Sequence, residues 1–192
     1  KNLTEKDDCE WITISGSHIC IGGDGIIKKG AGTFKGRNIN DVKKSFNSGT
    51  HTFDGINNVR KQLKQSHTKG LNFQILDQKG NKLGLGYGEM VGYYNRGQKQ
   101  IKLYRQVDEF SDEGRERIIK HEVGHHTYNW LLNSQERVEW RKIAKKENSP
   151  TEYAKLTIEE DFAESYMLYY SDSLETLSKE RLEFFKKYMD TK

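Results

Sequence analysis

Proline is nearly absent from the sequence, which contains only Pro150 among its 192 residues. A proline in the interior of a helix removes a backbone hydrogen bond and breaks or kinks the helix. The chain has no proline between Ser111 and Ser149. The sequence therefore permits long helices in its second half and places its one strong helix breaker at residue 150.

Cysteine is also scarce, since Cys9 and Cys20 are the only two in the chain. Their spacing is not C-x-x-C, which argues against a zinc knuckle or a redox pair. Two interpretations stay open. A disulfide between them would fit an exported protein, and two free thiols are the alternative.

Long apolar runs are missing too. No stretch approaches the ~20 apolar residues that cross a bilayer, so we expect no membrane span. A signal peptide is also missing, yet the chain begins with Lys1 instead of methionine. This is typical of a processed, secreted protein or of a trimmed chain, and we expect a secreted, extracellular protein.

The charge is not strongly of one sign, because 32 Lys and Arg face 28 Asp and Glu for a net charge of +4. Proteins that bind nucleic acid usually gather their basic residues in a stripe or patch. Here the basic residues are scattered, and the short cluster Lys142–Lys146 is typical of a solvated helix face. We expect no nucleic-acid partner.

The length and the hydrophobic pattern predict one α+β domain spanning residues 1–192. Residues 1–106 form its β-containing part, and residues 107–192 form its helical part. Alternation and turn residues predict a hairpin at Trp11–Ile21 and strands at Leu71–Asp77 and Gln100–Gln106. Helical periodicity predicts helices at Asn40–Phe46, Asp54–His67, from Ser111 or Asp112 onward, Ser134–Glu147, Thr157–Tyr170 and Ser173–Met189.

The stretch Lys120–His126 contains the motif H-E-x-x-H. On a helix, residues four apart share one face, so His121 and His125 can bind one Zn²⁺ together. Glu122 lies beside the metal without binding it and can take a proton from the attacking water. The alternative is a chance match, with two histidines on a helix surface. His126 points about 100° away from His125, which favours a packing or supporting role.

Two histidines leave a catalytic zinc site incomplete, because such sites use three protein ligands. The scheme H-E-x-x-H-x-x-G-x-x-H fails here, since Tyr128 and Leu131 occupy its glycine and histidine positions. The acidic residues of the predicted helix at Thr157–Tyr170 are the remaining candidates. Glu160 and Glu164 share a face, so Glu160 can bind the metal while Glu164 orients a ligand histidine.

Three alternatives stay open for this helix. Thr157 and Glu160 also fit a capping box, in which Glu160 would serve only the helix start. Glu159 and Asp161 are further candidates for the third ligand.

His-Glu-Val-Gly-His at residues 121–125, followed by Glu-Asp-Phe-Ala-Glu-Ser-Tyr at residues 160–166, resembles the catalytic domain of anthrax lethal factor and the related Pro-Pro endopeptidases. The resemblance covers about His121 to Tyr170. It implies that Glu160 is the third zinc ligand and that Tyr153, seven residues earlier, stabilises the oxyanion. It also implies a zincin-like α+β fold and peptide-bond hydrolysis by an exported bacterial protein.

These observations together predict a secreted zinc-dependent endopeptidase acting on a protein or peptide substrate. Its metal ligands would be His121, His125 and Glu160, and its catalytic groups would be Glu122 and Tyr153. We further expect an extended substrate to pair with a free edge of the strand Gln100–Gln106.

Two other functions remain as alternatives. One is a cytosolic regulatory H-E-x-x-H metallopeptidase that cleaves a repressor partner. The other is a non-catalytic zinc-binding or adhesion module. The presence of Glu122 and Tyr153 argues against the second, because zinc binding alone requires neither.

Overall fold

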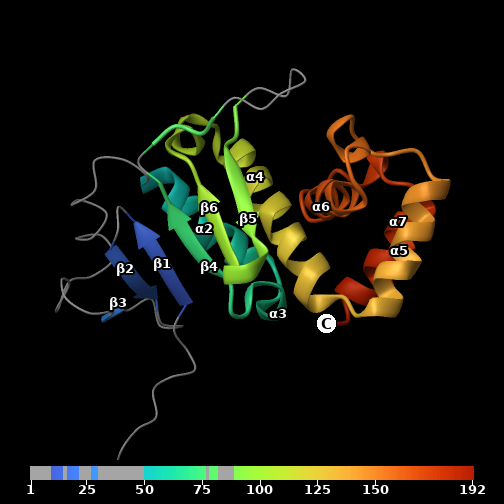
Figure 1. The fold of residues 1–192 in the computed structure, drawn as a ribbon, viewed down its shortest axis with the longest axis horizontal. Helices are drawn as coiled ribbons and strands as arrows, with labels where there is room; N and C mark the ends of the chain where they lie inside the picture. Colours follow the sequence, from blue (N-terminus) through green and yellow to red (C-terminus); the bar gives the residue numbers. More distant parts are fainter. Residues whose placement is uncertain (1–9, 15–16, 22–26, 30–49, 77, 82–88) are drawn as a thin grey trace, which may run out of the picture.

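The computed structural model describes residues 10–14, 17–21, 27–29, 50–76, 78–81 and 89–192. Within these residues, six strands form one mixed sheet in the order β3-β2-β1-β4-β6-β5 (Figure 1). The strands are β1 (Glu10–Ile14), β2 (Ser17–Ile21), β3 (Ile27–Lys29), β4 (Asn72–Ile75), β5 (Gly92–Asn95) and β6 (Gln100–Leu103). Strand β4 is parallel to β1 and β6, and the other neighbours are antiparallel. Together with the helices, this sheet makes the fold α+β, as the sequence predicts.

The predicted hairpin at Trp11–Ile21 is confirmed, because β1 and β2 pair antiparallel with Ile12 opposite Ile19. The predicted strand at Leu71–Asp77 is confirmed as the shorter β4, with Phe73 and Ile75 buried on one face. Two other predictions fall outside the described residues. These are the helix at Asn40–Phe46 and the Cys9–Cys20 disulfide.

The prediction that the strand Gln100–Gln106 has a free edge is wrong. Its observed core, β6, pairs with β4 on one side and with β5 on the other. Strand β5 was not predicted, because its sequence Gly-Tyr-Tyr-Asn lies in a glycine-rich stretch that does not alternate between polar and apolar residues. In the described sheet, β5 is therefore the terminal strand on this side.

The helices are α2 (Thr50–Gln62), α3 (Gln65–Thr68), α4 (Asp112–His126), α5 (Ser134–Lys146), α6 (Ile158–Tyr169) and α7 (Lys179–Phe184). The expected helix at Asp54–His67 begins earlier and is split. In its first described turn, Asp108 Oδ1 accepts hydrogen bonds from Thr52 N and Oγ1 at 2.8 and 3.1 Å. The split occurs where Lys64 adopts an extended backbone conformation between α2 and α3.

The expected final helix at Ser173–Met189 is also broken. A 3-10 turn at Leu174–Thr176 comes first, and Ser178 then caps a new helix start. The last turn, Phe185–Met189, is a π-helix. Within α5, Trp140 is fully buried, whereas Val138 is exposed.

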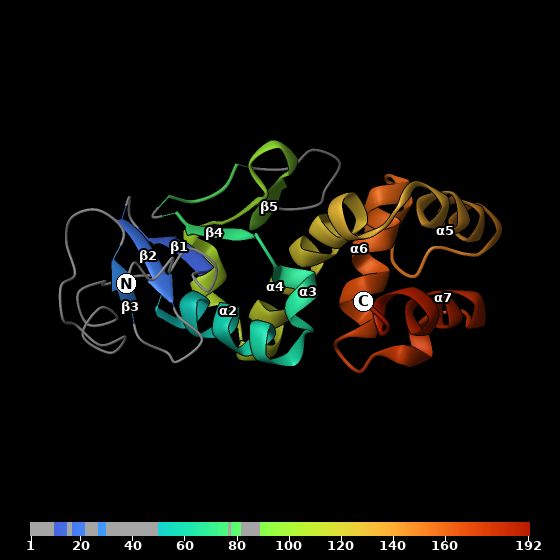
Figure 2. The ribbon, with the colours of Figure 1, turned by 90° about the horizontal axis from the view of Figure 1, so that it is seen from below.

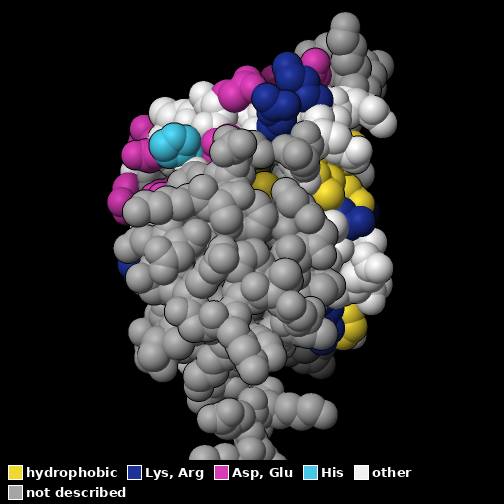
Figure 3. Space-filling view, turned by 90° about the vertical axis from the view of Figure 1, so that its left-hand side faces the viewer, with side chains coloured by type: hydrophobic (Ala, Val, Ile, Leu, Met, Phe, Trp, Pro, Cys, Tyr) yellow, Lys and Arg dark blue, Asp and Glu magenta, His cyan; other side chains and the backbone are white. Residues whose placement is uncertain are grey.

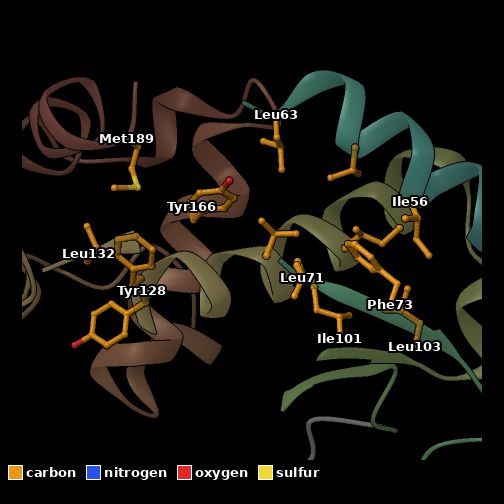
Figure 4. Close-up of a cluster of buried hydrophobic side chains, with 14 of the residues drawn as sticks. Ile56, Leu63, Leu71, Phe73, Ile101, Leu103, Tyr128, Leu132, Tyr166 and Met189 are labelled. Atoms are coloured by element: carbon orange, nitrogen blue, oxygen red, sulfur yellow. The ribbon is translucent and has the colours of Figure 1, made fainter. Parts of the chain in front are cut away.

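Helix α4 connects the part of the molecule that contains the sheet with the part formed by the C-terminal helices. It lies with α2 against one face of β4, β6 and β5, and α5, α6 and α7 lie on its other side (Figures 1 and 2). One cluster of buried side chains runs through both parts, from Phe53 on α2 to Met189 near the C-terminus. Figure 4 shows Phe73 and Ile101 of the sheet at one end of this cluster and Tyr166 of α6 toward the other.

The described surface is charged. On the face shown in Figure 3, Lys and Arg side chains lie beside Asp and Glu side chains. In the parts of the chain that the structure describes, no helix is both long enough and apolar enough to cross a membrane.

His67 is a fully buried titratable group in the core. Its Nε2 lies 3.2 Å from the carbonyl oxygen of Met189, which can only accept, so Nε2 carries the proton. Nδ1 lies 2.7 Å from the hydroxyl of Tyr166 and accepts from it. The ring is therefore neutral in the native state, and burial lowers the pKa of His67 to about 4.

This histidine predicts an acid-sensitive contribution to stability. The unfolded chain takes up a proton near pH 6.5, whereas the native chain does so only near pH 4. The contribution of His67 is therefore present above pH 6.5 and lost as the pH falls toward 4. Urea denaturation of the wild type and His67→Gln at pH 7 and pH 4.5 should show their stability difference shrinking by about 2–3 kcal/mol at the lower pH. An unchanged difference would contradict this prediction.

Candidate metal centre and active site

Helix α4 places the two histidines of H-E-x-x-H on one face. Ser111 begins the helix, because its hydroxyl accepts a hydrogen bond from the backbone N–H of Gly114 at 3.1 Å. Asp112 and Glu113 occupy the first turn, where negative charge is favourable. The rings of His121 and His125 lie with their centroids 4.8 Å apart.

A close helix crossing brings the acidic residues of α6 to these histidines. A Cβ atom on Gly124 of α4 would lie only 2.8 Å from Cα of Ala163 on α6. No real side chain tolerates that distance to a backbone atom, so the crossing requires glycine at this position. The close approach lets Glu160 and Glu164 of α6 reach His121.

Gly124→Ala should therefore damage both the fold and the site. The new methyl group must push α6 away from α4, which should destabilise the protein by about 1–3 kcal/mol and weaken metal binding by displacing Glu160. Thermal unfolding and zinc titration measure both effects. Gly97→Ala is the control, since its Cβ would meet only Asn95 Oδ1 at 3.6 Å. Equal behaviour of the two variants would show that the crossing tolerates a side chain.

Three atoms from the predicted ligands converge on one point. Nε2 of His121 lies 3.1 Å from Nε2 of His125. Oε2 of Glu160 lies 3.2 Å from the first nitrogen and 3.3 Å from the second. The structure thus brings together the three residues that the sequence predicts as metal ligands, in a group that could hold a metal ion.

The spacing of these atoms fits a tetrahedral metal site. Ligand atoms about 2.0–2.1 Å from a tetrahedral Zn²⁺ are about 3.3 Å from one another, close to the three distances above. Oε2 of Glu160 is also buried without a well-aligned hydrogen bond, although two ring nitrogens face it. A shared cation would satisfy all three atoms together. The two imidazoles and one carboxylate are a donor set that Zn²⁺ accepts.

Each histidine has an outer carboxylate on its other ring nitrogen. Nδ1 of His121 lies 2.7 Å from Oε1 of Glu164, and the second oxygen of Glu164 accepts from the Thr151 hydroxyl at 2.8 Å. Nδ1 of His125 lies 3.4 Å from Oε1 of Glu159. Such partners fix the orientation of ligand histidines in metal sites.

Asn129 holds Glu159 in place beside His125. Its Nδ2 donates to Oε1 of Glu159 at 2.7 Å and to the carbonyl oxygen of His125 at 2.8 Å. Asn129 belongs to the π-helical turn Thr127–Leu131 that continues α4. The wider turn therefore contributes a residue to the support of the second histidine.

Burial and neighbouring carboxylates set the charge of the site. Burial disfavours protonation of His121, but Glu160 and Glu164 outweigh it and raise the pKa of His121 to about 10. For His125, burial is outweighed by Glu159 and Glu160, and its pKa rises to about 9. Burial opposes ionisation of Glu160, but the two histidines lower its pKa to about 2. A divalent cation entering this site must therefore displace protons from the imidazoles.

Glu122 lies beside the three converging atoms, buried between α4 and β5. Burial raises the pKa of its carboxyl group. Its Oε2 has no hydrogen-bond partner among the described residues. Gly92 of β5 packs directly on it, since a Cβ at Gly92 would lie 3.1 Å from Oε1 of Glu122. The strand thus approaches one oxygen of the carboxylate closely, and the other is buried without a hydrogen-bond partner among the described residues.

These groups line a pocket of about 560 Å³. One wall comes from β5 and the residues before it, Glu89–Tyr94, and the others come from α4 and α6. Tyr153 also lines the pocket from a 3-10 turn, with its ring centroid 5.8 Å from that of His121. The predicted base and the predicted oxyanion-stabilising tyrosine therefore face the same space as the predicted metal ligands.

The remaining candidates from the sequence lie elsewhere. His126 is buried, with its Nδ1 3.0 Å from the hydroxyl of Tyr94, and does not join the three converging atoms. Asp161 is buried against Arg181, which binds both of its carboxylate oxygens. Thr157 caps α6 by accepting from the backbone N–H of Glu160 at 3.0 Å. That leaves the side chain of Glu160 pointed at the histidines.

Sequence reasoning missed several parts of the site. Asn129 and Thr151 were not singled out, although the i, i+4 spacing of His125 and Asn129 is a usable signal. Gly92 carried no signal, because its role depends on the packing of β5 against α4. Glu159 was considered only as a ligand, and the structure places it behind His125.

Comparison with known proteins gives no family assignment: no protein-family model, no curated protein and no solved structure matches the chain.

Proposed function

We propose that the protein is a zinc-dependent endopeptidase that hydrolyses peptide bonds of a protein or peptide substrate. The observation that carries this proposal is the convergence of His121, His125 and Glu160 beside a buried glutamate, at the wall of an open pocket. A metal site that only stabilises a fold is closed by four protein ligands. Three ligands facing a pocket are typical of a catalytic site.

His121, His125 and Glu160 would hold the metal, which when bound supplies a Lewis acid for the water and the scissile carbonyl. Glu122 would take the proton of the attacking water and pass it to the leaving amine. Its raised pKa suits this exchange, because a group that must both accept and donate works best with a pKa near the working pH. Tyr153 would donate a hydrogen bond to the oxyanion.

The substrate would lie along β5. This strand ends the described sheet and contributes backbone to the pocket wall, so an extended peptide could add to it as a further strand. The same role was expected of the strand Gln100–Gln106, which is enclosed. A substrate on β5 would have its backbone beside Glu122, since Gly92 of β5 packs on this side chain.

We also propose membership of the lethal factor and Pro-Pro endopeptidase family and an extracellular location, both expected from the sequence. The resemblance to lethal factor and the Pro-Pro endopeptidases supports Glu160 as the third ligand and Tyr153 as the group that stabilises the oxyanion. A zincin-like fold and secretion from a bacterium remain part of the proposal on that resemblance.

The test is cleavage of a peptide library by the protein loaded with zinc and by the same protein after chelation. We expect internal peptide bonds to be cut only by the loaded protein, and activity to return on adding zinc. A loaded protein that binds zinc and cuts no peptide would favour a non-catalytic zinc-binding module.

Tyr153→Phe separates catalysis from metal binding. It removes a hydroxyl that is expected to contact the oxyanion and not the metal. The variant should keep its zinc and lower kcat on the order of 100-fold, with a much smaller change in KM. Steady-state kinetics and metal analysis check both parts. A variant with full turnover would remove Tyr153 from the oxyanion site.

A further inference from the structure

We propose that Arg117 binds a carboxylate group of the substrate, so that cleavage favours peptides with a carboxylate near the scissile bond. This inference rests on the proposed function, whose site it extends. The carboxylate could come from an Asp or Glu side chain or from the C-terminus of a short substrate, and the guanidinium would recognise both in the same way.

Arg117 is one of the residues that line the pocket. It precedes His121 by four residues on α4, so the two side chains share a helix face. Ile118 and Met167 line the pocket as well. Among the described residues that line the pocket, Arg117 is the only Lys or Arg. A substrate held beside the metal ligands would therefore pass this one arginine.

The guanidinium of Arg117 lacks a close carboxylate among the described residues. Its Nη2 donates to the uncharged hydroxyl of Ser173 at 2.8 Å. Its nearest carboxylate contact is Glu113 at 4.0 Å, whose side chain is 80% exposed. Its Nε is buried and has no hydrogen-bond partner in the described structure. Arg181 differs from Arg117 in this respect, because its guanidinium donates to both carboxylate oxygens of Asp161.

The acidic residues around the pocket do not neutralise this cation. Glu159, Glu160 and Glu164 each contact a histidine, Glu122 is buried next to them, and Glu89 accepts from Nε2 of Gln106 at 3.5 Å. Arg117 thus lines the pocket without a close carboxylate partner among the described residues. An arginine fork in partly buried surroundings binds a carboxylate through paired, charge-assisted hydrogen bonds.

The experiment uses matched peptides that place Glu, Gln or Lys at each position flanking the scissile bond, each with a free or an amidated C-terminus. Cleavage rates are measured for the wild type, and dissociation constants are measured for the same peptides on Glu122→Gln. Both measurements are repeated with Arg117→Gln and Arg117→Glu. Arg141→Gln is the control, since it removes one exposed positive charge on α5, outside the pocket.

We expect Glu peptides to be preferred over Gln peptides on the order of 10-fold at one position, in cleavage and in binding. Arg117→Gln should abolish the preference, Arg117→Glu should shift it toward Lys, and Arg141→Gln should keep it. A preference that follows the free C-terminus instead identifies that carboxylate as the ligand. If Arg117→Glu fails to fold, Arg117→Gln alone decides.

The inference is overturned if the wild type treats Glu and Gln, and free and amidated ends, alike. It is also overturned if Arg117→Gln retains the preference. Failure of the proposed function gives a different result. In that case no peptide is cleaved, while Arg117-dependent binding of carboxylate peptides to Glu122→Gln can still be present.

Discussion

Glu122→Gln should retain zinc and the fold while losing on the order of 100- to 10,000-fold in peptide hydrolysis. The amide has the shape of the carboxylate but cannot take a proton from water. Glu122 is not one of the three residues whose atoms converge on the metal position, so the metal should stay. The substitution also removes a buried ionisable group whose burial raises its pKa, so stability should not fall.

Three measurements on one preparation check this prediction. Metal analysis should give the same zinc content as the wild type, thermal unfolding should give an equal or higher Tm, and peptide cleavage should be nearly absent. Glu116→Gln is a matched control, because it removes a carboxylate from the same helix, outside the pocket. A Glu122→Gln variant with more than a few per cent of wild-type activity would exclude Glu122 as the base.

Glu160→Ala should have the largest effect on the metal. Its Oε2 is the only carboxylate oxygen of the described chain that lies near Nε2 of both His121 and His125. Removing it leaves two imidazoles, which bind zinc far more weakly than three ligands do. Glu164→Ala and Glu159→Ala remove outer partners and should weaken zinc binding only by about 10- to 100-fold each.

Zinc competition with a chelator of known affinity ranks the three variants. The expected order of affinity loss is Glu160 first, with Glu164 and Glu159 well behind. If Glu164→Ala empties the site while Glu160→Ala leaves it full, the ligand lies one turn further along α6. Glu160 would then serve the helix start, and the role of Tyr153 would fall with it.

Local signals made much of the fold predictable. Thr157 before an acidic first turn marks the start of α6, and Ser111 does the same for α4. Phe73 and Ile75 alternate with polar residues, and this alternation predicts a strand. In each case the cause of the element lies within a few residues of it.

Other elements depend on distant partners and could not be read locally. In α2, Thr52 donates hydrogen bonds to Oδ1 of Asp108, which lies 56 residues away in the sequence. Strand β5 forms because β6 pairs with it, although its own sequence has no strand pattern. Because β5 was not predicted, the strand Gln100–Gln106 was wrongly expected to have a free edge for the substrate.

The same division holds for the site. The four-residue periodicity of α4 and α6 predicts which side chains share a face, and the structure brings His121, His125 and Glu160 together. The contact of Gly124 with Ala163 sets the distance between those faces. It could not be predicted from the sequence, because it depends on how the two helices pack. Arg117 could not be singled out either, because its lack of a close carboxylate is a property of the folded surroundings.

The most direct test of the metal site is X-ray absorption at the zinc edge on the purified protein, combined with metal analysis. We expect one zinc per chain, with only nitrogen and oxygen ligands at about 2.0–2.1 Å and the signature of two imidazoles. Absence of zinc after loading would contradict the site. Sulfur ligands at about 2.3 Å would also contradict it, because they would place the metal at the cysteines and not at His121, His125 and Glu160.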